Sequence, residues 1–457
     1  MHGGNGLNRE GDINTGWHRQ HWINGLDEES RSVLKEDEAV FIRQSMSTPC
    51  MDVIIDAEGC YLQAMSGKKY LDFHGNSVHQ VGYKNTYVIE AVKKQLESTP
   101  FIPRRYTADI AVQAAQRLID KTLSKDYKVL FTPSGSAAVG IALKIARKAT
   151  GRHKVISMWE SFHGAGLDAL SVGGEYVFSK DMGPAMPGSI KAIPFNAFRS
   201  MIHSSSKKTV ARFCLDYIEY IIQNERDIGA ILLEPIRATD VHVPPVYYFQ
   251  RLREICDKNG ILLIFDEIPT ALGRSGAFYV HQLFGVEPDI LVLGKGLGGG
   301  VIPQAAVLAR TKLDCAIDIS LGHYTHEKPA AGCAAICATL AYIDEFKLID
   351  QCKKLSAYAV KRSSQLFKRY ECLGDIRISG LLICFECVKD RKTREKDEAL
   401  AESLLYICLK NGLSFKLSAG NCITWHPPLI VTQEQLAFAF SVFENAIRDC
   451  SGQSKCT

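Results

Sequence analysis

Apolar residues between positions 128 and 294 occur in short runs that are separated by stretches of helical spacing. The runs are KVLFT (128–132), KVISM (154–158), AILLE (230–234), ILLIFD (261–266) and ILVLG (290–294). Runs of this length are typical of strands buried on both faces of a parallel sheet. Between them, AVGIALKIARKA (138–149) and YYFQRLREICDKNG (247–260) have apolar residues at helical spacing. The alternation predicts an α/β domain with a mainly parallel sheet.

The regions on either side of this domain have different patterns. Residues 1–35 are polar and are expected to form a loosely ordered arm, whereas residues 52–73 predict short strands joined by glycine-containing turns. After about residue 330, the pattern predicts long helices at about 330–371 and a strand at 380–388. Two further helices are predicted near 397–411 and 432–449. This order indicates a smaller α+β domain at the carboxyl end.

Composition excludes several classes of protein. Of the 457 residues, 46% are hydrophobic and 23% are charged, which is typical of a globular protein. The net charge of +4 does not indicate a nucleic-acid partner. The 15 cysteines form no Cys/His cluster with zinc spacing, so we expect reduced thiols, no metal site and a cytoplasmic location. There is no signal-peptide core and no apolar stretch of membrane-spanning length, so no membrane partner is expected.

Two predicted strands end in residues that can carry chemistry. Asp266 ends the strand in IFDEIPTALGRSG (264–276), at the edge where open α/β sheets place ligand groups, although an acid there can also be a plain turn cap. Lys295 follows the strand in PDILVLGKGLGGG (288–300) and has glycines on both sides. Burial of a lysine favours its neutral amine, which is a nucleophile and can form a Schiff base.

The same segment matches a dinucleotide-binding pattern. Gly294, Gly296 and Gly299 satisfy GxGxxG. That fingerprint must open a helix, whereas VIPQAAVLA (301–309) looks extended and contains Pro303. The context therefore disfavours a nicotinamide or flavin site.

Two further motifs follow strands of the same domain. In FTPSGSAAVGIALKIAR (131–147), Ser134, Gly135 and Ser136 open a helix, which suits an anion but also an ordinary serine cap. In WESFHGAG (159–166), Phe162 precedes His163, and by itself such an aromatic is more typical of a core. Together with a lysine and an acid, these are the parts that pyridoxal 5′-phosphate (PLP) requires.

From GKKYLDF (67–73) to PPLIVTQEQL (427–436), the sequence resembles the class III aminotransferases. The resemblance implies the type I fold of PLP-dependent transferases, with a small domain built from both ends of the chain. The implied division is an amino-terminal arm and part of the small domain (1–75), a large PLP-binding domain (76–335) and a carboxyl-terminal small domain (336–457).

The resemblance also implies roles for individual residues. Lys295 would hold PLP as a Schiff base, and Asp266 would pair with the ring nitrogen. Thr325, in HYTHEKPAAGCAA (323–335), would reach the phosphate across a dimer interface, which implies a homodimer or a dimer of dimers. The remaining implied PLP contacts are Ser134, Gly135 and Ser136 at the phosphate, Phe162 and Ile268 on the two ring faces, and His163 and Glu234.

Several positions depart from the family pattern. Pro269 replaces the usual Gln, and Ala137 and Val139 replace an acid and an Asn. In NCITWHPPL (421–429), Thr424 replaces the Arg that grips a substrate α-carboxylate. A hydroxyl cannot replace a bidentate guanidinium, so a half-reaction with common keto acids is disfavoured.

Other residues are candidates for a different anion site. They are Arg104 and Arg105 in FIPRRYTADI (101–110), Arg237 in LEPIRAT (233–239), Thr424 and His426. Each arginine could equally be an ordinary surface residue.

The segments FHGNSVHQVGY, PRRYT and NCITWHPPL resemble a lyase subgroup of the family that releases ammonia from hydroxylated aminophosphonates. The implied reaction eliminates water and then ammonia to give phosphonoacetaldehyde, with Lys295 as base and Lys295, His74, His79 or His426 as acid. The alternatives are an aminotransferase for 2-aminoethylphosphonate or another ω-amine, and a non-catalytic PLP-binding protein.

Overall fold

The computed structural model describes residues 16–45 and 50–453. Its largest sheet has seven strands in the order β4-β10-β9-β8-β7-β5-β6. These strands are β4 (Tyr127–Thr132), β5 (Lys154–Met158), β6 (Ser189–Ala192), β7 (Ile228–Leu233), β8 (Leu262–Asp266), β9 (Ile290–Leu293) and β10 (Ala305–Arg310). Strand β10 pairs antiparallel with both β4 and β9, whereas β9, β8, β7, β5 and β6 are parallel to one another. The predicted mainly parallel α/β sheet is therefore confirmed.

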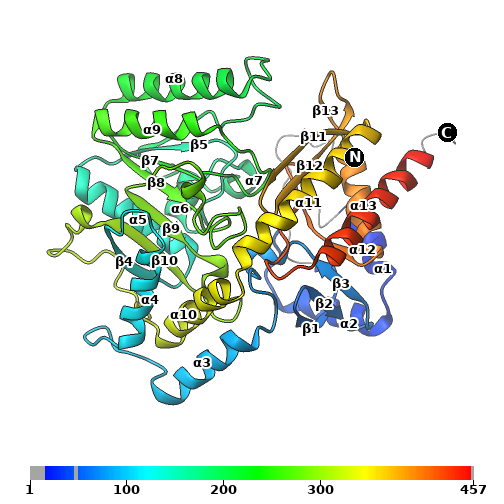
Figure 1. Cartoon of the computed structure of the whole chain (residues 1–457), viewed down its shortest axis with the longest axis horizontal. Coiled ribbons are helices and arrows are strands. Elements are labelled where there is room, and N and C mark those ends of the chain that lie inside the picture. Colours follow the sequence, from blue (N-terminus) through cyan, green and yellow to red (C-terminus); the bar gives the residue numbers. More distant parts are fainter. Residues whose placement is uncertain (1–15, 46–49, 454–457) are drawn as a thin grey trace.

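Helices cover both faces of this sheet (Figure 1). Helices α8 (Lys207–Glu225) and α9 (Val246–Asn259) lie on one face, and α5 (Gly135–Thr150) and α6 (Leu167–Val172) lie on the other. Successive residues of β8 point to opposite faces, so Phe265 joins the core under α9 and Ile264 joins the core under α5. Burial on both faces explains why the central strands are apolar at nearly every position.

A smaller part, on the right of Figure 1, holds both ends of the described chain. One sheet has the order β1-β2-β3-β14 and the other has the order β11-β12-β16-β15, with β13 paired to β12. Their strands are β1 (Ile54–Glu58), β2 (Tyr61–Ala64), β3 (Lys69–Asp72), β11 (Leu373–Ser379), β12 (Leu382–Asp390), β13 (Glu395–Lys396), β14 (Leu413–Ser414), β15 (Lys416–Ser418) and β16 (Cys422–Trp425). Parallel pairing of Leu71 with Leu413 joins the two ends of the chain in one sheet. The predicted small domain of both termini is confirmed, and the boundaries at residues 75 and 335 stay a prediction.

Long helices link and cover the two parts. Helix α10 (Ala330–Glu345) packs against α3 (Thr86–Ser98) and α4 (Asp109–Asp120), and α11 (Leu348–Arg369) runs from it to the smaller part. The remaining helices and 3-10 turns are α7 (Tyr176–Ser179), α12 (Glu398–Lys410), α13 (Gln433–Gln453), η1 (Gly75–Ser77), η2 (Val280–Leu283) and η4 (Thr311–Leu313). Within residues 16–45 and 50–453, no helix is long and apolar enough to cross a membrane.

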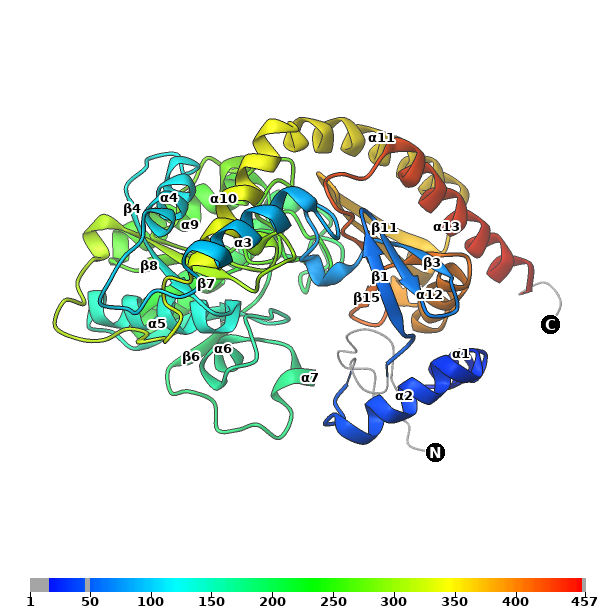
Figure 2. The ribbon, with the colours of Figure 1, turned by 90° about the horizontal axis from the view of Figure 1, so that it is seen from below.

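The prediction of a loosely ordered arm is wrong for the part that the structure describes. Helices α1 (Trp17–Asn24) and α2 (Glu28–Val40) occupy it, and Figure 2 shows them below the smaller part. Asp27 caps α2, because its carboxylate accepts a hydrogen bond from the Ser30 N–H over 2.8 Å. Only a few residues of these helices are buried, so their apolar pattern is faint. Residues 1–15 of the predicted arm lie outside the described residues.

Candidate active site

Lys295 and Asp266 stand at the ends of adjacent parallel strands. Asp266 of β8 pairs in register with Val292 of β9, and Lys295 begins the short turn η3 (Lys295–Gly298) just beyond β9. The backbone φ of Lys295 is 49°, a left-handed conformation that costs an L-residue about 1 kcal/mol. The sharp turn at the end of β9 thus places the lysine at the carboxyl edge of the sheet, where open α/β folds bind ligands.

The Asp266 carboxylate is held on both oxygens. His163 Nδ1 lies 2.8 Å from Oδ2, and the Ile268 backbone N–H donates to Oδ1 over 3.0 Å. Asp266 and His163 are only 1% and 2% exposed. A buried carboxylate in a fixed orientation can pair with a protonated ring nitrogen. His163 Nε2 has no hydrogen-bond partner among the described residues.

Glu234, immediately after β7, brings a second carboxyl group to this place. Burial, together with the charge of Asp266, raises the pKa of Glu234, while His163 and Lys295 oppose the shift. Its Oε2 accepts a hydrogen bond from the Ala238 N–H over 3.1 Å. Burial and the nearby Asp266 carboxylate thus both disfavour the charged form of Glu234.

The first turn of α5 has the shape of a phosphate cradle. Ser134 is its N-cap and accepts a hydrogen bond from the Ala137 N–H over 3.2 Å, whereas Ser136 Oγ accepts one from the Gly166 N–H over 2.8 Å. A Cβ on Gly135 would lie 2.8 Å from Cδ1 of Ile268. Glycine therefore lets Ile268 pack closely against the helix amino terminus, and the N–H groups and dipole of that terminus favour an anion.

Other predicted cofactor and substrate residues lie at the surface of the single chain. Phe162 is half-buried and its ring centroid is 4.5 Å from that of Phe178. Thr325 is exposed, as are Arg104 and Arg105. The Arg104 guanidinium lies 2.5 and 2.7 Å from the two ring nitrogens of His323, so the structure brings the segments around residues 104 and 325 together.

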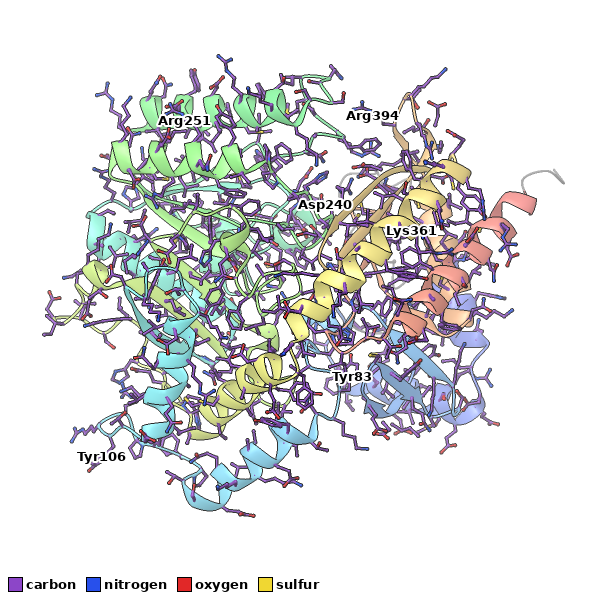
Figure 3. All side chains as sticks on the ribbon, in the orientation of Figure 1. Tyr83, Tyr106, Asp240, Arg251, Lys361 and Arg394 are labelled. Atoms are coloured by element: carbon purple, nitrogen blue, oxygen red, sulfur yellow. The ribbon has the colours of Figure 1, made fainter. Side chains whose placement is uncertain are left out.

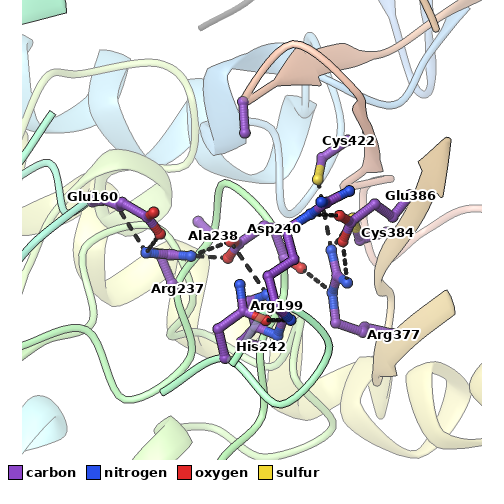
Figure 4. A network of polar contacts seen from close by, with 12 residues as sticks. Glu160, Arg199, Arg237, Ala238, Asp240, His242, Arg377, Cys384, Glu386 and Cys422 are labelled. Atoms are coloured by element: carbon purple, nitrogen blue, oxygen red, sulfur yellow. Dashed lines mark hydrogen bonds and ion pairs between the residues drawn. The ribbon is translucent and has the colours of Figure 1, made fainter. Parts of the chain in front are cut away.

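Arg237 lies in a buried network of charges (Figure 4). Its guanidinium binds both oxygens of Asp240, and NH1 donates to Glu160 over 2.8 Å. Asp240 also accepts a hydrogen bond on its backbone carbonyl from Arg377 of β11, which pairs with Glu386 over 2.6 Å. Asp240 stands where the two parts of the molecule meet (Figure 3). Arg237 thus pairs with two acids of the larger part, and Arg377 connects this network to the smaller part. The substrate-binding role of Arg237 stays a prediction.

Strand β16 carries Thr424, and His426 follows the strand directly. Thr424 is fully buried, and its hydroxyl donates to the Lys416 carbonyl over 3.3 Å. His426 lies just beyond the strand, where Nδ1 is 3.0 Å from Ser77 Oγ and Nε2 has no partner in the described part of the chain. Burial lowers the pKa of His426 well below its usual range, and Arg274, His74, Lys416 and Lys295 lower it further. His426 is therefore a neutral imidazole in a cationic neighbourhood that includes Lys295.

Two cationic residues near this place could not be identified from the sequence. Arg274 is fully buried, and none of its three guanidinium nitrogens has a hydrogen-bond partner within residues 16–45 and 50–453. Burial lowers the pKa of Arg274 to about 10. Lys416 pairs with Thr424 across β15 and β16. Arg274 lies within the motif IFDEIPTALGRSG, but the sequence does not show that it is buried. The position of Lys416 opposite Thr424 depends on strand register, which the sequence does not show either.

The backbone conformation after Lys295 shows whether the GxGxxG pattern can bind a dinucleotide. Gly294 and Gly299 flank a single 3-10 turn, and Gly296 lies within it. The chain then continues into strand β10. The extended segment predicted at 301–309 is confirmed from Ala305 onward, so the helix that a GxGxxG site needs is missing at this place.

Residues 43–447 match the model of the family described as "Aminotransferase class-III", and the chain belongs to this family. Among curated proteins, the chain is 46% identical to the (R)-1-hydroxy-2-aminoethylphosphonate ammonia-lyase of Vibrio splendidus (strain 12B01), over 96% of this chain and 94% of that protein. It is 30% identical to the leucine/methionine racemase of Thermococcus litoralis, over 91% of this chain and 95% of that protein.

Solved structures of similar proteins agree with this fold. A PLP-bound amine transaminase from an uncultivated Pseudomonas species has a TM-score of 0.85 at 29% identity, covering 90% of this chain and 99% of that one. The taurine:2-oxoglutarate aminotransferase of Bifidobacterium kashiwanohense, in complex with PLP and glutamate, has a TM-score of 0.87 at 26% identity, covering 93% and 98%. The predicted family and type I fold are confirmed.

Proposed function

We propose that this protein is a PLP-dependent ammonia-lyase that converts (R)-1-hydroxy-2-aminoethylphosphonate into phosphonoacetaldehyde and ammonia, a step of phosphonate catabolism. The observation that carries the proposal is 46% identity to a lyase of that name over nearly the whole of both chains. Thr424 supports it independently, because a buried hydroxyl that bonds a neighbouring carbonyl offers no guanidinium to a keto acid.

PLP is the cofactor, and the residues present fit it. The amine of Lys295 would hold it covalently, the first turn of α5 would receive its phosphate, and Ile268 would pack against its ring. The close approach of Ile268 to Gly135, where a Cβ would lie 2.8 Å from Cδ1 of Ile268, supports this placement. When bound, PLP supplies an electron sink for the carbon next to the substrate nitrogen.

Each proton transfer of the reaction is assigned to a particular side chain of the site. The Lys295 amine would remove a proton from the substrate carbon that bears nitrogen, and Asp266 would keep the cofactor ring nitrogen protonated. His163 fixes the orientation of Asp266 through the 2.8 Å contact. The neighbouring hydroxyl leaves as water with a proton from Lys295 or from a pocket histidine. The resulting enamine takes up one water, so the net products are one aldehyde and one ammonia.

An aminotransferase for 2-aminoethylphosphonate or another ω-amine is the second candidate. It is favoured by the family and by the transaminase structures that share this fold. The two candidates differ in what regenerates the cofactor: a lyase restores it in each turn, whereas a transaminase needs a keto acid.

The test is incubation with (R)-1-hydroxy-2-aminoethylphosphonate and no keto acid, with ammonia and aldehyde measured together. A lyase gives equal amounts of both, in many-fold excess over enzyme. Arrest after one equivalent, with restart on addition of pyruvate or 2-oxoglutarate, would instead establish the aminotransferase.

A homodimer or dimer of dimers fits the exposed residues. Thr325 is exposed in the single chain, as a residue that contributes to the site of a second copy would be. Large apolar side chains are exposed nearby, with Phe101 at 41% and Tyr106 at 68%, and Tyr106 stands at the rim of the molecule in Figure 3. The cytoplasm as its compartment is supported by the free cysteines, which form no disulfide in the described residues.

A further inference from the structure

Two residues in the loops beyond strands β5 and β7 have strained backbones. Glu160, in the β5 loop (residues 159–166), has a φ of 61°, and Val241, at the end of the β7 loop (residues 234–241), has a φ of 54°. A branched residue such as valine rarely takes this left-handed conformation, because it is sterically costly. Such strain persists only where the surrounding contacts fix the chain, so those contacts show what holds the two loops.

Arg237 joins these two loops through its whole guanidinium group (Figure 4). Its Nε donates to Asp240 Oδ1 over 2.8 Å, and NH2 binds the other oxygen of the same carboxylate. NH1 donates to the Glu160 carboxylate, also over 2.8 Å. The Arg237 carbonyl accepts a hydrogen bond from the strained Val241 N–H over 2.9 Å. Arg237 thus binds one strained residue through its side chain and the other through its backbone.

Both loops carry residues that surround Asp266. His163 lies three residues after Glu160 in the β5 loop, and its Nδ1 is 2.8 Å from the Asp266 carboxylate. Glu234 opens the β7 loop, and the parallel register of β7 and β8 sets it beside Asp266. The ion pair between Arg237 and Glu160 therefore joins two loops that act on one carboxylate.

The same network reaches the smaller part of the molecule. The backbone carbonyl of Asp240 accepts a hydrogen bond from Nε of Arg377, in β11, over 2.6 Å. NH1 of Arg377 pairs with Glu386 of β12 over 2.6 Å, and Arg199 of the larger part binds the same carboxylate. Asp240, Arg377 and Glu386 are almost completely buried. Because an unpaired buried charge is costly, the network favours one arrangement of the two parts.

We propose that Arg237 is a positioning residue of the cofactor site. Its ion pair with Glu160 fixes the β5 loop, and this loop in turn keeps His163 against the Asp266 carboxylate. Arg377 connects the arrangement to the smaller part. The inference rests on the proposed role of Asp266 at the cofactor ring, and it applies to a lyase and to an aminotransferase alike. It also explains why the three nitrogens of Arg237 are engaged by two acids of the protein and not held ready for a substrate anion.

The test is a double-mutant cycle that is measured as affinity for PLP, by fluorescence titration of the cofactor-free protein. Glu160→Gln removes one charge of the ion pair at an exposed position and should weaken PLP binding about fivefold, since coupling through such networks has about this size. If the ion pair acts through His163, the same substitution should have almost no effect in a His163→Gln background. A contribution to folding alone would give the same factor in both backgrounds.

Glu219→Gln is the matched control. Glu219 of α8 pairs with Arg251 of α9 over 3.2 Å, between two helices that cover the large sheet, and Arg251 is labelled in Figure 3. This variant should bind PLP as the wild type does in both backgrounds. Arg377→Lys keeps the charge but cannot reproduce the geometry of the guanidinium, so its effect should depend on His163 as that of Glu160→Gln does.

Unchanged PLP affinity of Glu160→Gln, or an equal effect with and without His163, overturns the proposal. A higher KM of Arg237→Lys for the aminophosphonate, with normal PLP affinity, also overturns it and assigns Arg237 to the substrate. Dependence on His163 for Glu160→Gln but not for Arg377→Lys removes the connection to the smaller part. Unchanged PLP affinity of His163→Gln alone would show that His163 does not act on the cofactor, and the inference would fail.

Ammonia release by the wild type does not enter this cycle, so the lyase and the positioning role can fail separately. Melting temperature confirms that each variant is folded. If Glu160→Gln does not fold, Arg237→Lys replaces it in the cycle, and the same loss of PLP affinity and the same dependence on His163 are expected.

Discussion

The Nδ1 atom of His163 lies 2.8 Å from Oδ2 of Asp266, and both side chains are almost completely buried. Because the other carboxylate oxygen accepts the Ile268 N–H, Asp266 cannot rotate freely toward a ligand. His163 comes from the segment after β5 and Asp266 ends β8, so two strands of the sheet fix one charge. The carboxylate is oriented by the protein before any ring nitrogen reaches it, which reduces the reorganisation that catalysis requires.

Replacement of this carboxylate should affect chemistry more than folding. Asp266→Asn keeps the shape of the side chain but cannot stabilise a protonated ring nitrogen as strongly, so kcat should fall about a hundredfold or more. The melting temperature should change by only a few degrees. His163→Gln, which disturbs only the orientation, should cost less. Near-wild-type turnover of Asp266→Asn would assign Asp266 a structural role alone.

Lys295→Ala should abolish turnover and the visible absorption of the cofactor-bound protein. Removal of a catalytic amine costs about a thousandfold or more in rate. The protein should still fold, because Lys295 contributes little to the core. Lys361→Ala on the exposed side of α11 is the control and should keep both activity and absorption. An active Lys295→Ala variant without added amines would contradict the assignment of Lys295.

Gly135→Ala should weaken cofactor binding about tenfold, since overpacking of this kind costs about 1–3 kcal/mol. The added methyl group would lie 2.8 Å from Cδ1 of Ile268. Ile268→Val deletes that carbon, so the double variant should recover much of the lost affinity. Fluorescence titration of the cofactor-free protein with PLP measures all three variants. Equal affinity of Gly135→Ala and wild type would mean that the phosphate does not lie at this turn.

Buried histidines should make the fold sensitive to mild acid. Burial lowers the pKa of His79 to about 4, although Asp72 lies 3.9 Å away. An unfolded histidine has a pKa near 6.5, so between about pH 4 and 6.5 the unfolded chain binds more protons and stability falls as the pH falls. The full loss from His79 is about 3 kcal/mol, because each pKa unit is worth 1.36 kcal/mol.

His79→Gln should therefore flatten the decrease in unfolding free energy between pH 7 and pH 4, and denaturant titrations at each pH measure it. The glutamine amide can still donate to the Asp72 carbonyl, which the His79 ring contacts over 3.1 Å. His153→Gln replaces an exposed histidine and is the matched control. A slope unchanged from that of the wild type would show that His79 does not titrate with unfolding.

Local patterns predicted the elements whose burial is uniform. Asp266 and Lys295 follow apolar runs that became β8 and β9, because a strand buried on both faces must be apolar whatever its neighbours are. Features that depend on residues distant in the chain could not be predicted from the sequence. The register that sets Lys416 opposite Thr424, and the pairing of Arg237 with Glu160, arise only when separate segments of the chain meet.

Thr424→Arg tests whether the loss of the arginine defines the reaction. Thr424 is fully buried opposite Lys416, so the larger side chain must extend into the space beside the Lys416 ammonium and bring a second cation to it. We expect ammonia release from the aminophosphonate to fall at least tenfold, since overpacking by 1–3 kcal/mol has about that effect. Binding of α-amino acids should either stay unchanged or become tighter. A change in cofactor absorbance on addition of L-alanine measures it. Thr424→Ser, which keeps the hydroxyl donor to the Lys416 carbonyl, should behave like the wild type. Faster ammonia release by Thr424→Arg would show that a guanidinium suits the native substrate, and the argument from Thr424 for a lyase would then fail.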